Sequence, residues 1–198
     1  MHAGRAAHMC AALGWRMRQP TGPRMRGPLH KLHVVDPFTV TTTIARPREE
    51  VFEYLADIAN HAEFSDHYLV DWHLLRENSY GTGAGARFRA KAPLSRFSWA
   101  DVTLTEVTPP YRIVEKGRGG KFNRIRMLGT YTLTPGASGT TVVEHTFETL
   151  PPLLSDKLME SLGGGSWTRR NIARAMRRMR TILEEGRDRG RRPSVAAR

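Results

Sequence analysis

The sequence predicts an α+β fold in which a curved antiparallel sheet of about seven strands wraps around a long C-terminal helix. Three observations lead to this prediction. Residues 166–185 carry apolar side chains at a helical period, several shorter segments before them alternate polar and apolar residues, and turns rich in glycine or proline separate those segments. A helix with one long apolar stripe needs an apolar surface to lie on, and alternating strands supply such a face.

The final helix has the strongest pattern in the chain. Ile172, Met176, Met179 and Leu183 recur at i, i+4, i+7 and i+11, which places them on one face. At a rise of 1.5 Å per residue the helix is about 30 Å long. Most of its arginines fall off the stripe and are expected to lie in water: Arg169, Arg170, Arg174, Arg177, Arg178 and Arg180.

The first elements follow from local composition. Residues 38–44 form a β-branched run typical of a strand. Pro47, followed by Glu49 and Glu50, marks the start of a helix that ends near residue 58, because proline and acidic side chains favour the first helical turn. A short second helix or turn is expected over residues 60–66.

Alternating strands are then expected over residues 68–75, 86–91, 97–107, 111–116, 125–133 and 141–148. In the segment 97–107 the apolar positions shift from Phe97 and Trp99 to Val102 and Leu104, and a β-bulge between them would explain the shift. A helical segment over residues 153–162 follows, and three glycines at 163–165 interrupt it before the final helix.

Charge is concentrated at the two ends of the chain. The net charge is +12 over 198 residues, yet residues 38–168 hold fourteen basic and fifteen acidic side chains. We therefore predict a disordered basic leader over residues 1–36, one domain over 37–187 and a disordered basic tail over 188–198. The arginine-rich ends either bind nucleic acid or anionic membrane weakly, or are simply solvated, and no aromatic residue follows Trp167 to stack on bases.

Cysteine and hydropathy patterns limit the class of protein. Cys10 is the only cysteine, so neither an intrachain disulfide nor a cysteine metal site within one chain is possible. No apolar run approaches the roughly 18 residues of a membrane span. No convincing secretory signal is present, and we expect a cytoplasmic protein.

Polar motifs do not form a catalytic constellation, and no cofactor or metal is expected. His61, His67, Asp66 and Asp71 could be imagined as a metal site, but their pattern favours exposed polar residues of a helix and loop. The glycines at 81–85 favour a hairpin turn over a phosphate loop, since they lie between strands. Those at 163–165 favour a flexible break over an anion site.

His145 is the most informative polar residue. Val143 and Phe147 flank it on the apolar face of a strand, where an unpaired imidazole costs free energy. One interpretation is a ligand contact or acid–base group in a cavity. The other is a core histidine hydrogen-bonded to Tyr131 or to a backbone carbonyl.

Several segments together resemble a known family: 44–47 with 51–52 and 55–57, then 106–110 before a strand, and the glycine-interrupted C-terminal helix. Over residues 38–186 the chain resembles the START-like, or helix-grip, superfamily, in its bacterial polyketide cyclase/dehydrase and lipid-transport (SRPBCC) branch. The resemblance implies a cavity between sheet and helix that holds an apolar or aromatic small molecule. Functions in the family range from carriers and sensors to aromatase/cyclases.

We therefore predict a protein that binds a hydrophobic or aromatic small molecule, such as a lipid or polyketide. A polyketide aromatase/cyclase, and nucleic-acid or anionic-membrane association through the ends, are the alternatives. The oligomeric state stays open. The candidate cavity residues are Phe64, Tyr68, Trp72, Phe88, Trp99, Met127, Tyr131, His145, Phe147, Met159, Trp167 and Met176.

Overall fold

The computed structural model describes residues 36–92, 97–153, 155 and 164–195. Residues 1–35 of the expected leader lie outside this range. So do most of the helical segment expected over 153–162 and, with it, Met159.

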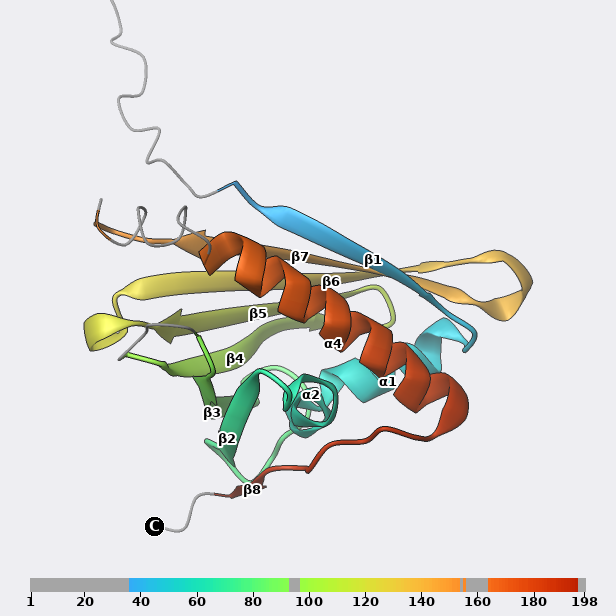
Figure 1. The fold of residues 1–198 in the computed structure, drawn as a ribbon. Coiled ribbons are helices and arrows are strands. Elements are labelled where there is room, and N and C mark those ends of the chain that lie inside the picture. The colour runs from blue at the N-terminus through green and yellow to red at the C-terminus, as the bar shows by residue number, and fades with distance from the viewer. Residues whose placement is uncertain (1–35, 93–96, 154, 156–163, 196–198) are drawn as a thin grey trace, which may run out of the picture. The chain divides into compact units, whose positions relative to one another are not determined.

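Seven antiparallel strands and one short parallel strand form a single sheet (Figure 1). Their order across the sheet is β1-β7-β6-β5-β4-β3-β2-β8. Consecutive strands from β2 to β7 pair with one another, whereas β1 pairs with β7. The predicted α+β fold is confirmed, with these strands: β1 (Phe38–Ile44), β2 (Leu69–Leu74), β3 (Gly85–Ala90), β4 (Trp99–Thr108), β5 (Arg112–Gly119), β6 (Ile125–Pro135), β7 (Thr141–Leu150) and β8 (Ser194–Val195).

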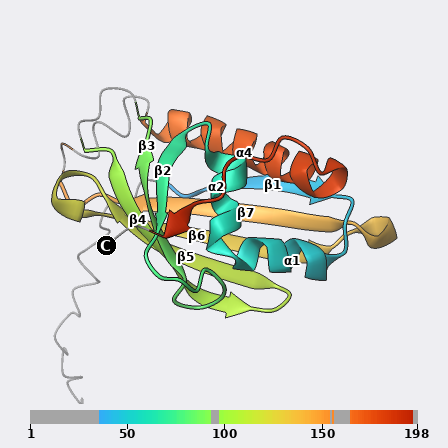
Figure 2. The same ribbon diagram turned by 90° about the horizontal axis from the view of Figure 1, so that it is seen from below.

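Among the described residues, three α-helices accompany the sheet: α1 (Arg48–Ala56), α2 (Ile58–Ser65) and α4 (Gly165–Glu185). Asp57 separates the first two, and its carboxylate accepts a hydrogen bond from the Ala59 N–H, which caps α2. Helix α2 lies between α4 and β2 (Figure 2). Single 3₁₀ turns, η1 (Lys121–Asn123) and η2 (Ala137–Gly139), connect β5 to β6 and β6 to β7.

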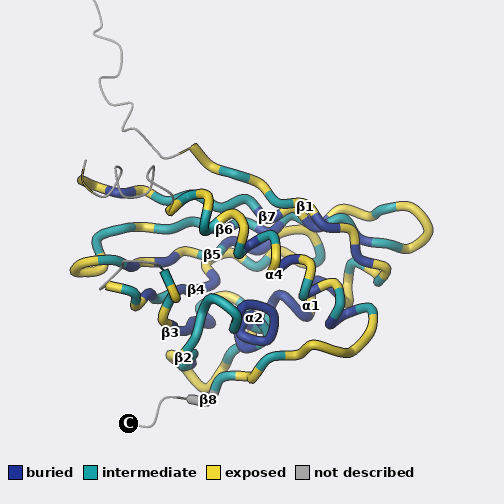
Figure 3. The backbone as a smooth tube through the Cα atoms, viewed as in Figure 1, coloured by how far each residue is buried: buried dark blue, intermediate teal, exposed yellow. Residues whose placement is uncertain are grey.

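The apolar stripe of α4 is buried as predicted. Exposed and buried positions alternate along this helix, whereas α2 is buried almost throughout (Figure 3). The helix ends at Gly186, which adopts a left-handed conformation at φ +69° and donates its N–H to the Ile182 carbonyl. The buried residues of α4 are Ile172, Ala175, Met176, Met179, Ile182 and Leu183.

Strand β4 corrects the expected position of its bulge. The register shifts between Leu104 and Glu106, so Thr105 is the extra residue. Before this point the alternation is regular, with Ala100 and Val102 buried. Trp99 therefore lies on the outer face of the sheet, where 44% of its surface is exposed.

The segment after α4 differs from the expected disordered tail. It runs past α2 and ends in β8, which pairs with the edge strand β2 (Figure 1). The Gly190 N–H donates to the Glu63 carbonyl at 2.9 Å. An otherwise exposed edge of the sheet is thus partly covered.

Arginines hold this segment on α2. Arg189 binds the buried carboxylate of Glu63 at 2.7 Å, and Arg192 binds Asp57 at 2.7 Å. From α4, Arg178 pairs with Asp66. In the sequence these three arginines count among the basic residues that could bind a polyanion. In the structure they form ion pairs with acidic side chains of the protein itself.

We predict that Arg189→Ala lowers the free energy of unfolding by about 1–3 kcal/mol, because it leaves the buried Glu63 carboxylate with the Tyr54 hydroxyl and, 3.9 Å away, Arg192 as its partners. Urea denaturation measures the change. The control is Arg191→Ala, whose exposed side chain should contribute less than about 0.5 kcal/mol. Equal stability of the two variants would show that the C-terminal segment is dispensable.

Candidate functional site

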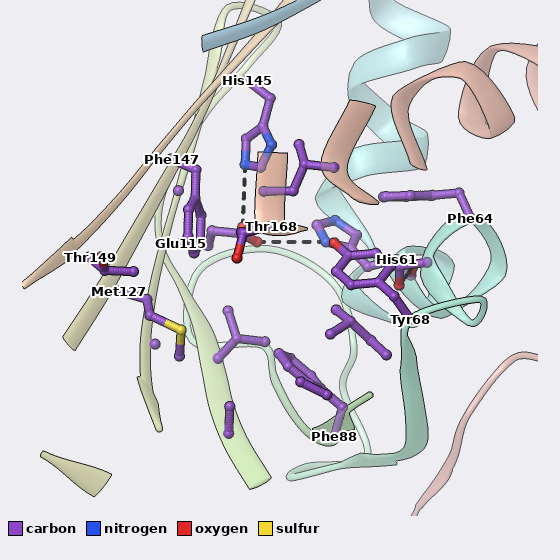
Figure 4. Close-up of a pocket in the computed structure, with 18 of the residues that line it drawn as sticks. His61, Phe64, Tyr68, Phe88, Glu115, Met127, His145, Phe147, Thr149 and Thr168 are labelled. Atoms are coloured by element: carbon purple, nitrogen blue, oxygen red, sulfur yellow. Dashed lines mark hydrogen bonds and ion pairs between the residues drawn. The ribbon is translucent and has the colours of Figure 1, made fainter. Parts of the chain in front are cut away.

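An apolar cavity of about 200 Å³ lies between the inner face of the sheet, α2 and α4 (Figure 4). Strands β2 to β7 form one wall, while α2 and the first turns of α4 form the other. Aromatic and small aliphatic side chains make up most of the lining. Nine of the predicted cavity residues lie in it: Phe64, Tyr68, Trp72, Phe88, Met127, Tyr131, His145, Phe147 and Trp167.

The other three predicted residues are not in the described lining. Trp99 points away from the cavity and stacks on His73, with ring centroids 6.5 Å apart. Met176 is fully buried in the core farther along α4, where its side chain packs rather than lining free space. Met159 lies outside the described residues.

The polar centre of the cavity is Glu115, which the sequence did not single out. Alternation along β5 directs Ile113, Glu115 and Gly117 to the inner face. Directly opposite Glu115 on β6 is Gly129, where an added Cβ would collide with the Glu115 carboxylate. An inward acidic residue facing a glycine across the strand pair is the sequence signal that could have identified it.

Two imidazoles flank this carboxylate, one on each oxygen (Figure 4). His145 Nε2 lies 3.6 Å from Glu115 Oε1, and His61 Nδ1 lies 3.7 Å from Oε2. Both separations are beyond ordinary hydrogen-bond length, so these contacts are electrostatic. The Glu115 side chain is 14% exposed, which leaves it facing the cavity rather than bulk solvent.

His61 is not the exposed residue that its sequence context indicated. It is 4% exposed, and its Nε2 donates a hydrogen bond to the Leu55 carbonyl at 2.8 Å. When the imidazole is neutral, this bond leaves the Nδ1 lone pair directed at Glu115. The sequence prediction failed because α2 turns His61 toward the sheet, where Glu115 on β5 and Tyr131 on β6 face its ring.

His145 is buried, and it lacks the hydrogen bond to Tyr131 or to a backbone carbonyl that one of its two interpretations required. Its ring is 4% exposed and stacks face to face on Tyr131, with centroids 4.1 Å apart and planes 8° apart. Neither ring nitrogen has a hydrogen-bond partner among the described residues. Tyr131 therefore packs against His145 instead of satisfying it.

Burial and charge act in opposite directions on the pKa values of Glu115 and His61. Burial tends to raise the pKa of Glu115, but the neighbouring His145 and His61 outweigh it and lower that pKa below its usual range. Burial lowers the pKa of His61, and the Glu115 charge offsets this only in part. Burial, together with the Glu115 charge, raises the pKa of Tyr131, so its phenol stays protonated. The arrangement is thus an ionised carboxylate beside a neutral His61.

The imagined metal site is not assembled. Asp66 pairs with Arg178 and Asp71 with Arg89, while His61 lies in the cavity. Across the described ranges, no group of three or more histidine, cysteine or acidic side chains could hold a metal ion. Within the same ranges, no helix combines the length and apolar character needed to cross a membrane.

Comparison with protein families identifies the chain. A family model described as polyketide cyclase / dehydrase and lipid transport matches residues 37–184. The chain belongs to this family. Comparison with curated proteins gives no significant match.

Solved structures with the same helix-grip fold include norcoclaurine synthase from Thalictrum flavum. The truncated enzyme superimposes with a TM-score of 0.59 at 10% identity, covering 77% of this chain and 96% of that one. The protein TTHA0849 from Thermus thermophilus gives 0.57 at 12% identity, covering 75% and 97%. At these sequence identities the structural similarity shows the fold alone. It does not identify the ligand of this protein.

We predict that acid destabilises the protein through His61. Because the folded-state pKa of His61 lies below its ordinary value of 6.5, the unfolded chain takes up the proton first as the pH falls through that region. The free energy of unfolding should therefore decrease from about pH 7 to about pH 5. Glu115, whose pKa lies below its ordinary value of 4.5, lowers the free energy of unfolding only at still lower pH, where its carboxylate becomes protonated.

His61→Gln tests this assignment, since glutamine can still donate to the Leu55 carbonyl but does not titrate. Denaturant midpoints measured across the pH series should be flatter for the variant than for the wild type. An unchanged slope would assign the acid sensitivity to other groups.

Proposed function

We propose that this protein binds a small, largely apolar ring compound that carries a hydrogen-bond donor, and that the donor meets Glu115. The observation that carries the proposal is a buried carboxylate inside an apolar cavity, without a hydrogen bond from either flanking imidazole at 3.6–3.7 Å. A ligand hydroxyl or ammonium group would supply the missing donor.

The energetics favour a ligand over an empty polar site. A buried acceptor without a donor costs about 1–3 kcal/mol, and a charged one costs more. His145 adds two ring nitrogens without described partners, one of them facing Glu115. One hydroxyl placed beside the carboxylate could both donate to Glu115 and accept from His145.

Cavity size limits the ligand. An apolar cavity of about 150 Å³ is enough for benzene, and this one measures about 200 Å³. A ligand of one or two rings therefore fits its described walls better than an extended chain. Phe88, Trp72 and Phe147 would contact the ring faces, since their side chains line the apolar part.

One structural neighbour agrees with this ligand class. Norcoclaurine synthase, in complex with dopamine and hydroxybenzaldehyde, superimposes with a TM-score of 0.57 at 14% identity, covering 86% of this chain and 98% of that one. Both of its ligands are single rings with hydroxyl groups. By analogy of fold alone, this neighbour supports a hydroxylated aromatic ligand.

A matched pair of probes tests the anchor. We predict that 2-naphthol binds more tightly than naphthalene, and that Glu115→Gln weakens 2-naphthol about five- to ten-fold while leaving naphthalene unchanged, because it replaces a charged acceptor with a neutral one. Isothermal titration measures both affinities.

Two controls accompany that titration. Glu106→Gln changes an exposed carboxylate on β4 and should leave both affinities unchanged. Ala100→Phe fills the cavity wall and should abolish both. Equal affinity of the wild type for the two probes would show that Glu115 does not anchor the hydroxyl group. Binding that survives Ala100→Phe would show that the probes bind outside this cavity.

Acid–base catalysis of the polyketide aromatase/cyclase type is the second candidate, favoured by the position of Glu115 between two imidazoles. Such a carboxylate could take a proton from the carbon next to a ligand carbonyl and return it after rearrangement. We predict that the protein accelerates exchange of these protons in 2-tetralone for deuterium, measured by NMR in deuterated water. Glu115→Gln should abolish the acceleration, whereas no acceleration by the wild type would favour a binding protein.

A further inference from the structure

One end of the sheet carries large apolar side chains that are exposed to solvent. Phe122, in the η1 turn between β5 and β6, is 85% exposed. Phe97 and Trp99 at the start of β4 are 52% and 44% exposed, and Leu150 at the end of β7 is 37% exposed. We call these four residues the tip patch. Large apolar groups gathered in this way on a protein surface mark a site of interaction.

The tip patch lies beside one end of the cavity lining. Strand register pairs Ala100 with Gly119 and Met127 with Gly117, so the lining residues at the start of β4 and β6 and the end of β5 lie close to the η1 turn. Near this end Met127 and Thr149 of the lining are half-buried, while Ala100 and Gly117 are buried; His61 and His145 are 4% exposed. The more exposed part of the lining thus lies at the end of the sheet that carries the tip patch.

The backbone of the η1 turn holds Phe122 away from the protein. Phe122 has φ +59° and Asn123 has φ +54°, both in the left-handed region. A bulky residue in this region is rare and strained. The strained turn leaves the Phe122 ring in solvent rather than in the core. The ring can therefore gain hydrophobic burial only by contact with another surface.

Basic side chains gather at the η1 turn beside Phe97 and Phe122, and Asp101 lies opposite Arg118 across β4 and β5. Residues 118–126 include Arg118, Lys121, Arg124 and Arg126 and no acidic residue. Lys121 Nζ lies 5.3 Å from the ring centre of Phe122 and 5.9 Å from that of Phe97. Aromatic rings and ammonium groups are thus presented side by side at one turn.

We propose that the tip patch docks on a membrane surface that contains anionic lipid. Aromatic side chains favour the level of the lipid headgroups, and each lysine or arginine near an anionic surface adds electrostatic attraction. The cationic turn complements the lipid charge, while Phe122 and Phe97 enter the headgroup layer. Docked in this way, the more exposed part of the cavity lining lies toward the bilayer, from which an apolar ligand can enter.

The composition of the tip patch favours a lipid over a nucleic acid. Stacking on bases would use Phe97, Trp99 and Phe122, but it leaves no role for the aliphatic Leu150, which register places opposite Arg126. The lipid surface accommodates aromatic and aliphatic side chains alike. The docking itself goes beyond the proposed function and can be measured without any cavity ligand, so either idea can fail alone.

The test is flotation of the full chain with vesicles of phosphatidylcholine alone or mixed equally with phosphatidylglycerol. We expect binding to the mixed vesicles, about ten-fold weaker for Phe122→Ser and about five-fold weaker for Lys121→Gln. The matched control is Leu75→Ser, which removes a side chain that is 49% exposed at the opposite end of β2. The basic ends of the chain are identical in all four proteins, so their contribution cancels.

Insertion depth gives a second readout. Brominated lipid should quench the fluorescence of the tryptophan introduced by Phe122→Trp. It should not quench that of the tryptophan introduced by Leu75→Trp. The proposal is overturned if the wild type does not float, or if Phe122→Ser and Leu75→Ser float equally with it. It is also overturned if Phe122→Ser affects only the binding of single-stranded RNA, or only self-association seen by light scattering.

Discussion

The packing of α4 on the inner face of the sheet governs both the stability and the cavity of this protein. In the second half of the helix, Met176, Met179 and Ile182 are almost completely buried, and each contributes about 1.5–3 kcal/mol of hydrophobic stabilisation. Toward its first turns the helix faces Ala100, Gly117 and other small residues of the strands. There the two layers do not fill the space between them, and the cavity is what remains.

Placing a carboxylate in that space works against folding. Glu115 is desolvated, and the two neighbouring imidazoles at 3.6–3.7 Å give it no hydrogen bond to offset the cost. Stability alone would favour an apolar residue at this position. A polar group retained against the local packing rule is typical of a functional site, and this is why the proposed function centres on Glu115.

Periodic patterns predicted the elements and much of the cavity wall, because burial on a helix or strand follows directly from residue spacing. The stripe of α4 and the nine lining residues are of this kind. Trp99 was misplaced because the bulge in β4 lies at Thr105 rather than before Val102. Which face a side chain occupies depends on where such an irregularity falls, and composition does not specify that.

Other features depended on contacts between distant segments. His61 is buried because α2 directs it at the sheet, against Glu115 of β5 and Tyr131 of β6. Glu115 was missed since its side chain fits only where Gly129, on another strand, leaves room. Neither relation is visible in a window of neighbouring residues, although both follow once the strand register is known.

The pairing of the first strand with β7 also sets the order in which the protein can be built. Thr39 bonds to Thr146 across 107 residues, so a ribosome adding 5–20 residues per second needs roughly 5–20 s to synthesise one partner after the other. During that time β2 to β6 can already form hairpins, while their cavity face awaits α4. The nascent chain therefore displays its apolar cavity wall before the helix that covers it exists, and a chaperone that shields this face would act in that interval.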